Sequence, residues 1–339
     1  MPLLIVVLGI CLLLVLILVF KFNSFLSFVI VSISVALAEG MTLDQAVLSI
    51  EKGIGNTMGF LVLILCLGSM LGKLVSESGA AQRITTKLVN AFGLKHIQLA
   101  LMLTGFIVGV SLFYDVGFFI MIPLVFTVAA STGLPLLYVG LPMLAALSVT
   151  HGYLPPHPAP TAIVGVFNAD LGKTLVYGII VAIPAIFVSG PILSKALSKI
   201  DAKPFAEFVN VKPLKDEEMP GFWISFFSAL LPVLLITLAT IAGFLLPEGN
   251  AVRKVLGWIG NPVFAMLLAV LFAIYTLGIA RGRKIIDIMN SLAHSVTSIT
   301  MIMLLIAGAG ALKQVLIDAG VSDYIGGLLS ESSLSPLFL

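Results

Sequence analysis

The stretch SLFYDVGFF, residues 111–119, places one acidic residue, Asp115, in the middle of the most hydrophobic part of the chain. Between Lys95 and Asp170 it is the only Asp, Glu, Lys or Arg. A charged side chain at the bilayer centre costs at least ~2.5–3.5 kcal/mol on insertion scales, so such residues usually face a cavity and mark ion or proton pathways. Asp115 is therefore a candidate functional acid. A second interpretation, compatible with the first, is that it caps a helix starting after a break at residues 115–117.

The composition of the whole chain indicates a polytopic membrane protein. Of its 339 residues, 60% are hydrophobic and 10% are charged, whereas soluble globular domains average about 45–50% and about 25%. The net charge of +2 is too small to favour a nucleic-acid partner. Cys11 and Cys66 lie far apart in apolar runs, so the sequence predicts neither a disulfide framework nor a zinc site. The first apolar run lacks the basic region and cleavage site of a signal peptide and is predicted to be the first span.

Apolar stretches that are long enough, or nearly so, to cross the hydrocarbon core recur along the chain. They fall near residues 3–20, 24–38, 58–76, 97–113, 117–131, 134–149, 174–197, 222–246, 257–279 and 296–317. The sequence therefore predicts an all-α polytopic membrane protein of about ten membrane segments. The short middle segments at 117–149 are either two tilted spans or a re-entrant hairpin.

The longest polar interruption, residues 198–220, divides the chain. It carries four lysines among acids and prolines, which is typical of an exposed loop. Placing this loop in the cytoplasm also delivers Arg281, Arg283 and Lys284 to the cytoplasm, as the positive-inside rule requires. The predicted division is an N-terminal membrane half over 1–197, the cytoplasmic loop, and the start of a C-terminal half over 221–339.

An internal repeat relates the two halves. GSMLGKLVSESGAAQRI at residues 68–84 resembles AGALKQVLIDAGVSDYI at residues 309–325. The alignment matches Glu77 with Asp318, Gly79 with Gly320 and Ile84 with Ile325. The predicted spans around the two copies run in opposite directions, so the repeat is inverted, as in many secondary transporters. By the same symmetry the second repeat is incomplete, and about a hundred C-terminal residues are expected beyond Leu339.

The stretch HGYLPPHPAPT, residues 151–161, is the most specific local motif. Its four prolines within six residues predict non-helical backbone, which membrane proteins tolerate only where protein or a water-filled cavity satisfies it. The motif is therefore a candidate cavity lining, and His151 and His157 are candidates to titrate or to donate hydrogen bonds to an anion. The alternative is a surface loop whose histidines only tolerate water. With no further His or Cys nearby, a metal site is not expected.

The stretch FNADLGKT, residues 167–174, carries Asn168, Asp170 and Lys173 ahead of the next apolar run. We expect it to be a helix-capping, interfacial loop rather than a functional element.

The chain resembles the gluconate permease family of bacterial sugar-acid:proton symporters. The resemblance rests on GFIVGVSLFYDVGFFIMIPL, GLPMLAALSVTHGYLPPHPAPTA and GSMLGKLVSESGAAQRI, and it extends over essentially the whole chain. It implies a multi-pass protein of the bacterial inner membrane that imports gluconate or a related sugar acid together with protons, without a cofactor. The candidate substrate-binding and proton-binding residues are Ser111, Tyr114, Asp115, Thr150, His151, His157 and Thr161.

The residues between Lys95 and Lys173 are compatible with the binding of a sugar-acid anion together with a proton. The region between Lys95 and Lys173 offers no cation for a carboxylate, so helix N-termini, hydroxyl groups and a histidine must serve. An ionised Asp115 near the site repels an anion and a protonated one does not, which couples proton and substrate binding.

Other functions are less well supported by the sequence. An intramembrane hydrolase needs a second acid at membrane depth, H-E-x-x-H, or a Ser–His pair on facing helices. H-E-x-x-H is absent, and Asp115 has no acidic partner at membrane depth. A passive channel is disfavoured by inverted repeats with interrupted helices. A permease of the same family for another small acid, such as a D-amino acid or a short hydroxy acid, and an inactive truncated fragment remain as alternatives. The sequence leaves open whether the chain forms a homo-oligomer.

Overall fold

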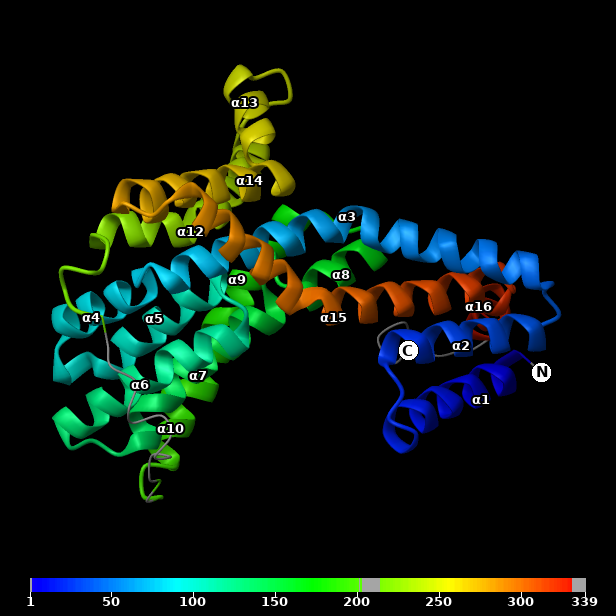
Figure 1. Cartoon of the computed structure of the whole chain (residues 1–339), viewed down its shortest axis with the longest axis horizontal. Helices are drawn as coiled ribbons and strands as arrows, with labels where there is room; N and C mark the ends of the chain where they lie inside the picture. Colours follow the sequence, from blue (N-terminus) through cyan, green and yellow to red (C-terminus); the bar gives the residue numbers. More distant parts are fainter. Residues whose placement is uncertain (1, 201, 203–213, 331–339) are drawn as a thin grey trace. The chain divides into compact units, whose positions relative to one another are not determined.

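The computed structural model describes residues 2–200, 202 and 214–330, and every regular element in these ranges is a helix (Figure 1). The helices from the N-terminus to the polar loop are α1 (Pro2–Leu14), α2 (Ser24–Ala38), α3 (Leu43–Glu77), α4 (Ala80–Phe92), α5 (Ile97–Ser111), α6 (Tyr114–Thr132), α7 (Leu136–Tyr153), α8 (Pro158–Val166), α9 (Leu171–Phe187) and α10 (Leu193–Ala196). The helices after it are α12 (Phe222–Leu245), α13 (Ala251–Ile259), α14 (Pro262–Ala273), α15 (Ile285–Asp318) and α16 (Val321–Ser330).

The prediction of an all-α polytopic membrane protein is confirmed. Among the described residues, seven helices are long and apolar enough to cross a membrane, and α3 makes an eighth if its two parts count as one span. Two shorter apolar helices, Ser24–Ala38 and Val116–Ala129, coincide with two of the predicted segments. The apolar stretches therefore marked the membrane helices correctly.

Asparagine and aspartate side chains set the starts of several helices. Asn23 accepts hydrogen bonds from the amides of Phe25 and Leu26 at the start of α2. Asp170 accepts from the amide of Lys173 at 2.7 Å at the start of α9, so the loop at residues 167–174 caps a helix as expected.

One predicted span begins later than expected. The sequence places it at residues 257–279, but Asn261 caps a new helix, α14, and Pro262 occupies its first position. Pro is favoured at that position because its missing N–H and fixed φ suit the first turn. Residues 251–259 consequently form a separate short helix, α13.

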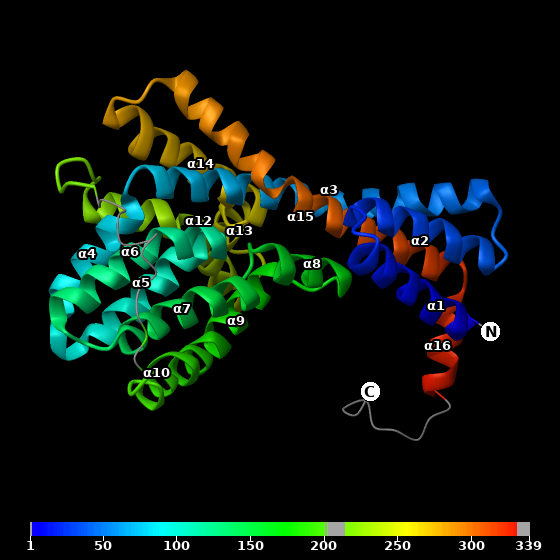
Figure 2. The same ribbon diagram turned by 60° about the horizontal axis from the view of Figure 1, so that its bottom comes forward.

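The chain divides into two compact units, one of residues 1–62 and 300–339 and one of residues 63–299. In the first unit the early part of α3 and the late part of α15 run antiparallel, and α2 packs against them (Figure 2). A Cβ atom on Gly53 would collide with the backbone oxygen of Gly310, so these glycines allow the two helices to approach closely. The division predicted from the sequence repeat remains a prediction.

In the second unit α5, α7 and α9 lie side by side (Figures 1 and 2). Gly105 and Gly109, four residues apart on α5, face α7: a Cβ on Gly105 would collide with the Met143 carbonyl oxygen, and one on Gly109 with Thr150 Oγ1. This is the small-xxx-small pattern that brings membrane helices together. It places the end of α5 directly against α7.

Each long helix ends in a carboxylate that joins it to the other. Glu77, at the end of α3, accepts from Lys73, Arg283 and Ser291; we call these four residues the Glu77 cluster. Asp318, at the end of α15, accepts from Gln314, Lys52 and Ser49; these four form the Asp318 cluster.

The two clusters contain the same three kinds of partner. In each, one partner lies four residues earlier on the same helix, one is a serine of the other long helix, and one is a basic residue of the other repeat. Both helices are followed by a glycine in the left-handed region, Gly79 at φ 76° and Gly320 at φ 75°. These matched contacts between antiparallel helices support the inverted repeat read from the sequence.

The described end of the polar loop, residues 214–220, is fixed to α4. Gln82 exchanges two hydrogen bonds with the backbone of Leu214, and the buried guanidinium of Arg83 donates to Asp216 and to the Pro220 carbonyl. Arg281 donates to the carbonyl oxygens of residues 217 and 218. The basic segments that the positive-inside rule assigned to the cytoplasm therefore meet at the end of this loop; residues 203–213 lie outside the described part of the chain.

Candidate functional site

The first element of the site is the break between α5 and α6. The α5 helix ends at Ser111, Leu112 is extended, and α6 begins at Tyr114 with Phe113 at its N-cap. The prediction of a break at residues 115–117 is wrong by three residues, because the amide of Gly117 already donates to the Phe113 carbonyl at 2.9 Å. Asp115 consequently lies in the first turn of α6 and is not its N-cap. The Asp115 side chain lies outside what the structure describes.

The second element is the break between α7 and α8. His151 lies in the last turn of α7, which ends at Tyr153, and His157 is the N-cap of α8. The prediction that all four prolines lie in non-helical backbone is wrong for Pro158 and Pro160, which lie in the first turn of α8. Proline is tolerated there because the first-turn N–H groups have no helical acceptor.

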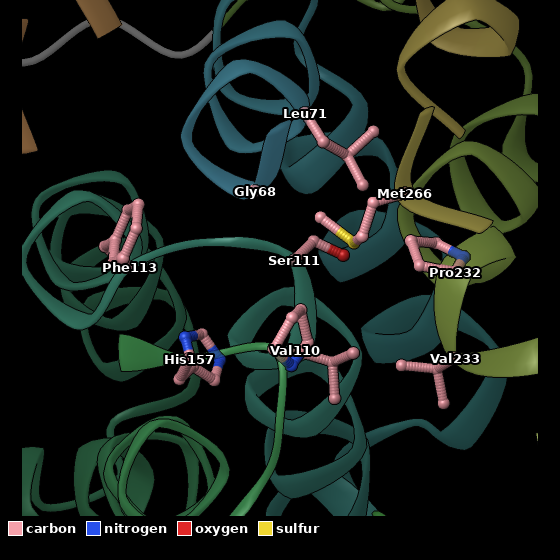
Figure 3. A pocket seen from close by; sticks show the side chains of 10 residues that line it. Gly68, Leu71, Val110, Ser111, Phe113, His157, Pro232, Val233 and Met266 are labelled. Carbon is pink, nitrogen blue, oxygen red and sulfur yellow. The ribbon is translucent and has the colours of Figure 1, made fainter. Parts of the chain in front are cut away.

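A pocket opens where the two breaks meet (Figure 3). Ser111, Phe113, Pro156 and His157 line it from the breaks. Its other walls come from α5 and from three further helices of the same unit: Val110 on α5, Gly68 and Leu71 on α3, Pro232 and Val233 on α12, and Met266 on α14. None of the described lining residues is Asp, Glu, Lys or Arg. The pocket therefore combines apolar walls with a hydroxyl group and an imidazole.

His157 and His151 form a pair beside this pocket. Their ring centroids are 4.7 Å apart, and the Phe113 ring lies 6.2 Å from each. His157 is buried, and its Nε2 atom lies 2.6 Å from the carbonyl oxygen of Gly109. The two sequence motifs singled out above are thus joined in space at their broken backbones.

Ser111 ties the first break to α12. Its side chain is buried, and its Oγ donates to the carbonyl oxygen of Ala229 at 2.6 Å. Its hydroxyl hydrogen is used in this bond, so towards the pocket Ser111 can act only as a hydrogen-bond acceptor, through its oxygen lone pairs.

The remaining predicted residues have different surroundings. Thr150 is buried, donates to the carbonyl oxygens of Ala146 and Leu147 in its own helix, and packs against Gly109. The buried Thr161 hydroxyl, in α8, has no hydrogen-bond partner among the described residues. The Tyr114 ring stacks on Phe118 at 5.8 Å and lies 6.4 Å from the His151 ring. Among the predicted residues whose side chains are described, Ser111 and His157 thus line the pocket, whereas Thr150 joins α7 to α5.

No sequence pattern predicted that α3, α12 and α14 would form walls of the pocket. Only Pro232, a proline inside an apolar span, carried a recognisable signal, because proline removes a helical hydrogen bond. No group of three or more His, Cys, Asp or Glu within the described ranges is placed to hold a metal ion.

Comparison with known proteins identifies the family. The model of the GntP family permeases matches residues 1–339. The chain is 51% identical to the high-affinity gluconate transporter of Escherichia coli (strain K12) and 49% identical to the Gnt-II system L-idonate transporter of the same strain; each match covers 100% of this chain and 77% of the relative. It is 46% identical to the gluconate permease of Bacillus subtilis (strain 168), over 100% of this chain and 78% of that protein.

These relatives are transporters by name, and the helices described above are those of a multi-pass membrane protein. The chain belongs to the GntP family of permeases, and is a membrane transporter rather than an enzyme.

Proposed function

We propose that this chain imports gluconate or a closely related sugar acid across the bacterial inner membrane together with protons. The observation that carries the proposal is the pocket at the two helix breaks, which offers Ser111 and His157 but no fixed charge among its described lining residues. Such a lining suits a small polyhydroxy anion whose charge is met by helix ends and whose hydroxyl groups need both donors and acceptors. The names of the relatives support this substrate class.

The proposed partner of the substrate carboxylate is the N-terminus of α6. Phe113, the N-cap, lines the pocket and makes no side-chain cap hydrogen bond to the first turn of α6. A helix N-terminus carries a partial positive charge equivalent to about half an elementary charge, which favours an anion. Broken membrane helices bind carboxylate substrates in this way in other transporters.

Asp115 is the proposed proton acceptor, because it is the isolated acid of this region and lies in the first turn of α6. When protonated it no longer repels the anion, so proton and substrate bind with positive coupling. The membrane potential makes this coupling useful. An anion entering a negative interior is opposed by about 2.3 kcal/mol per 100 mV, which one accompanying proton cancels.

A competition assay tests the substrate. Cells that lack gluconate uptake of their own and produce this chain are given radiolabelled gluconate, with unlabelled gluconate, L-idonate, a D-amino acid or a short hydroxy acid as competitors. We expect gluconate to compete at the lowest concentration. A D-amino acid or short hydroxy acid that competes better would contradict the proposal.

L-idonate is the second candidate substrate, because one relative of 49% identity is named for it. The two acids have the same functional groups and differ in stereochemistry, so they can occupy one pocket with different affinities. Preferential competition by L-idonate would select this candidate without changing the proposed mechanism.

A further inference from the structure

The break at the end of α5 leaves a backbone acceptor that His157 satisfies. The last hydrogen bond of α5 runs from the amide of Leu112 to the carbonyl of Val108. The next carbonyl, that of Gly109, lies beyond this last bond because Phe113 belongs to the start of α6. His157 Nε2 lies 2.6 Å from the Gly109 oxygen, within hydrogen-bond distance. The end of one broken helix is thus paired with the N-cap of another.

This contact assigns the hydrogen on the His157 ring. A carbonyl oxygen only accepts hydrogen bonds, so Nε2 must carry the hydrogen and donate. In a neutral imidazole one nitrogen is a donor and the other an acceptor. Nδ1 of a neutral His157 consequently carries a lone pair.

The surroundings of His157 favour the neutral ring. His157 is 4% exposed, and no described carboxylate forms an ion pair with it. A second imidazole, that of His151, has its centroid 4.7 Å away. Charging a buried ring without a counter-charge is costly, and a neighbouring imidazole supplies none. With Asp115 protonated, as proposed for the substrate-binding state, the donor to Gly109 is one N–H of a neutral imidazole.

The acceptor nitrogen belongs to a side chain that lines the pocket. His157 lines the pocket with Phe113 and Val110 (Figure 3), and the only hydrogen bond it makes to the described residues is that of Nε2. A substrate carboxylate cannot donate to a lone pair, but a substrate hydroxyl can. This distinguishes His157 from the amides at the α6 N-terminus, which donate.

We infer that His157 is a specificity-determining residue that accepts a hydrogen bond from one hydroxyl of the substrate, and that Gly109 fixes the tautomer that makes this possible. The inference rests on the proposed function, since it assigns the polyol part of the same substrate to a particular side chain. It predicts selection for hydroxy acids over carboxylates of similar size that lack that hydroxyl. A site built around a substrate hydroxyl rejects the analogue that lacks it because its own polar group is left unpaired.

Competition by the monodeoxy derivatives of gluconate tests the inference, in membranes containing the full chain and labelled gluconate. For the wild-type chain, we expect one derivative to compete about 10-fold to 100-fold more weakly than gluconate. In His157→Leu, which has no acceptor, the same derivative and gluconate should compete equally. An unchanged ratio in His157→Leu would overturn the inference.

Two further substitutions distinguish a residue 157 that accepts a hydrogen bond from the substrate from one that attracts the substrate as a cation. Gln can donate to Gly109 through its amide nitrogen and accept through its oxygen, whereas Lys only donates. His157→Gln should therefore keep at least a 10-fold preference for gluconate over the discriminating derivative, about the lower end of the wild-type range. His157→Lys should lose gluconate binding. This pair decides the question even if His157→Leu does not reach the membrane, and stronger gluconate binding by the Lys variant than by the Gln variant would overturn the inference.

The exposed His96, at the start of α5, gives the matched control, and His96→Gln should leave all the ratios unchanged. Failure of the wild-type chain to bind gluconate at all would overturn both the proposed function and this inference. Gluconate binding with equal competition by every derivative would overturn this inference alone.

Discussion

Ser49 donates a hydrogen bond to the carboxylate of Asp318 at 2.8 Å, although 269 residues separate the two in sequence. Ser291 makes the corresponding contact with Glu77 at 2.6 Å. In each case a serine early in one long helix meets the acid that ends the other. An inverted repeat explains this reciprocity, because each copy contributes the same two groups in opposite directions.

In the Glu77 cluster, swapping the charges of Glu77 and Arg283 is predicted to destabilise the protein less than reversing the charge of Arg283 alone. Arg283→Glu puts two carboxylates in contact, and we expect it to lower the free energy of unfolding by about 1 kcal/mol, because the pair is partly exposed and screened. The double variant Glu77→Arg with Arg283→Glu should recover at least half of the loss. Thermal unfolding of the purified protein in detergent measures both. A double variant as unstable as the sum of its single changes would contradict a direct pairing.

Gly109→Ala is predicted to disturb the contact between α5 and α7. The added methyl group would collide with Thr150 Oγ1 and would press on Leu147, so overpacking should cost about 1–3 kcal/mol. Thr150→Ala removes the colliding oxygen and should restore part of the lost stability in the double variant. Gly152→Ala is the matched control, because a Cβ there meets nothing within 4 Å. Equal loss in the Gly109 and Gly152 variants would show that packing against α7 is not the cause.

Arg83 is predicted to hold residues 214–220 in place. Its guanidinium donates to the Asp216 side chain and to backbone carbonyl oxygens. Several nitrogens of the guanidinium take part, and the single nitrogen of a lysine side chain cannot replace them. Arg83→Ala and Arg83→Lys should both speed limited proteolysis of this segment, by roughly 5-fold or more if about 1 kcal/mol of local stability is lost.

The same assay tests the orientation of the chain. Cleavage should occur in inside-out membrane vesicles and not in right-side-out ones, because the positive-inside rule places this segment in the cytoplasm. Cleavage only from the outer side would reverse the assigned orientation.

Asp115→Asn is predicted to separate substrate movement from proton movement. The amide is permanently neutral, so it neither repels the anion nor carries a proton, and uptake should no longer be driven by a pH gradient. Exchange of labelled for unlabelled gluconate across vesicle membranes should persist, because it requires no net proton transfer. Full gradient-driven accumulation by Asp115→Asn would exclude Asp115 as the coupling acid.

The sequence predicted the fold well because lipid imposes a strong and local signal. An apolar run such as residues 222–246 must be helical in a bilayer, whatever its neighbours are. The α12 helix, Phe222–Leu245, accordingly lies within one residue of that prediction at its C-terminal end and begins at the same residue.

The site was only partly predictable, because its residues are brought together by tertiary packing and not by a local sequence signal. The histidines and Ser111 were recognised because their sequence motifs are unusual, but Met266 and Leu71 reach the pocket through the packing of distant helices, which no local pattern encodes. The position of the first break was misjudged because Gly117 resembles a helix breaker, whereas Leu112 and Phe113, which carry no breaking signal, adopt the extended conformations. The role of His157 depends on an orphan carbonyl created by that break, and therefore required the structure.

Proton movement on addition of substrate tests the central claim most directly. De-energised cells producing this chain are suspended in weak buffer, gluconate is added, and the external pH is recorded, with vector-only cells as the control. The account predicts a gluconate-dependent alkalinisation that an uncoupler abolishes. Uptake of labelled gluconate by the same cells without any alkalinisation would contradict proton symport.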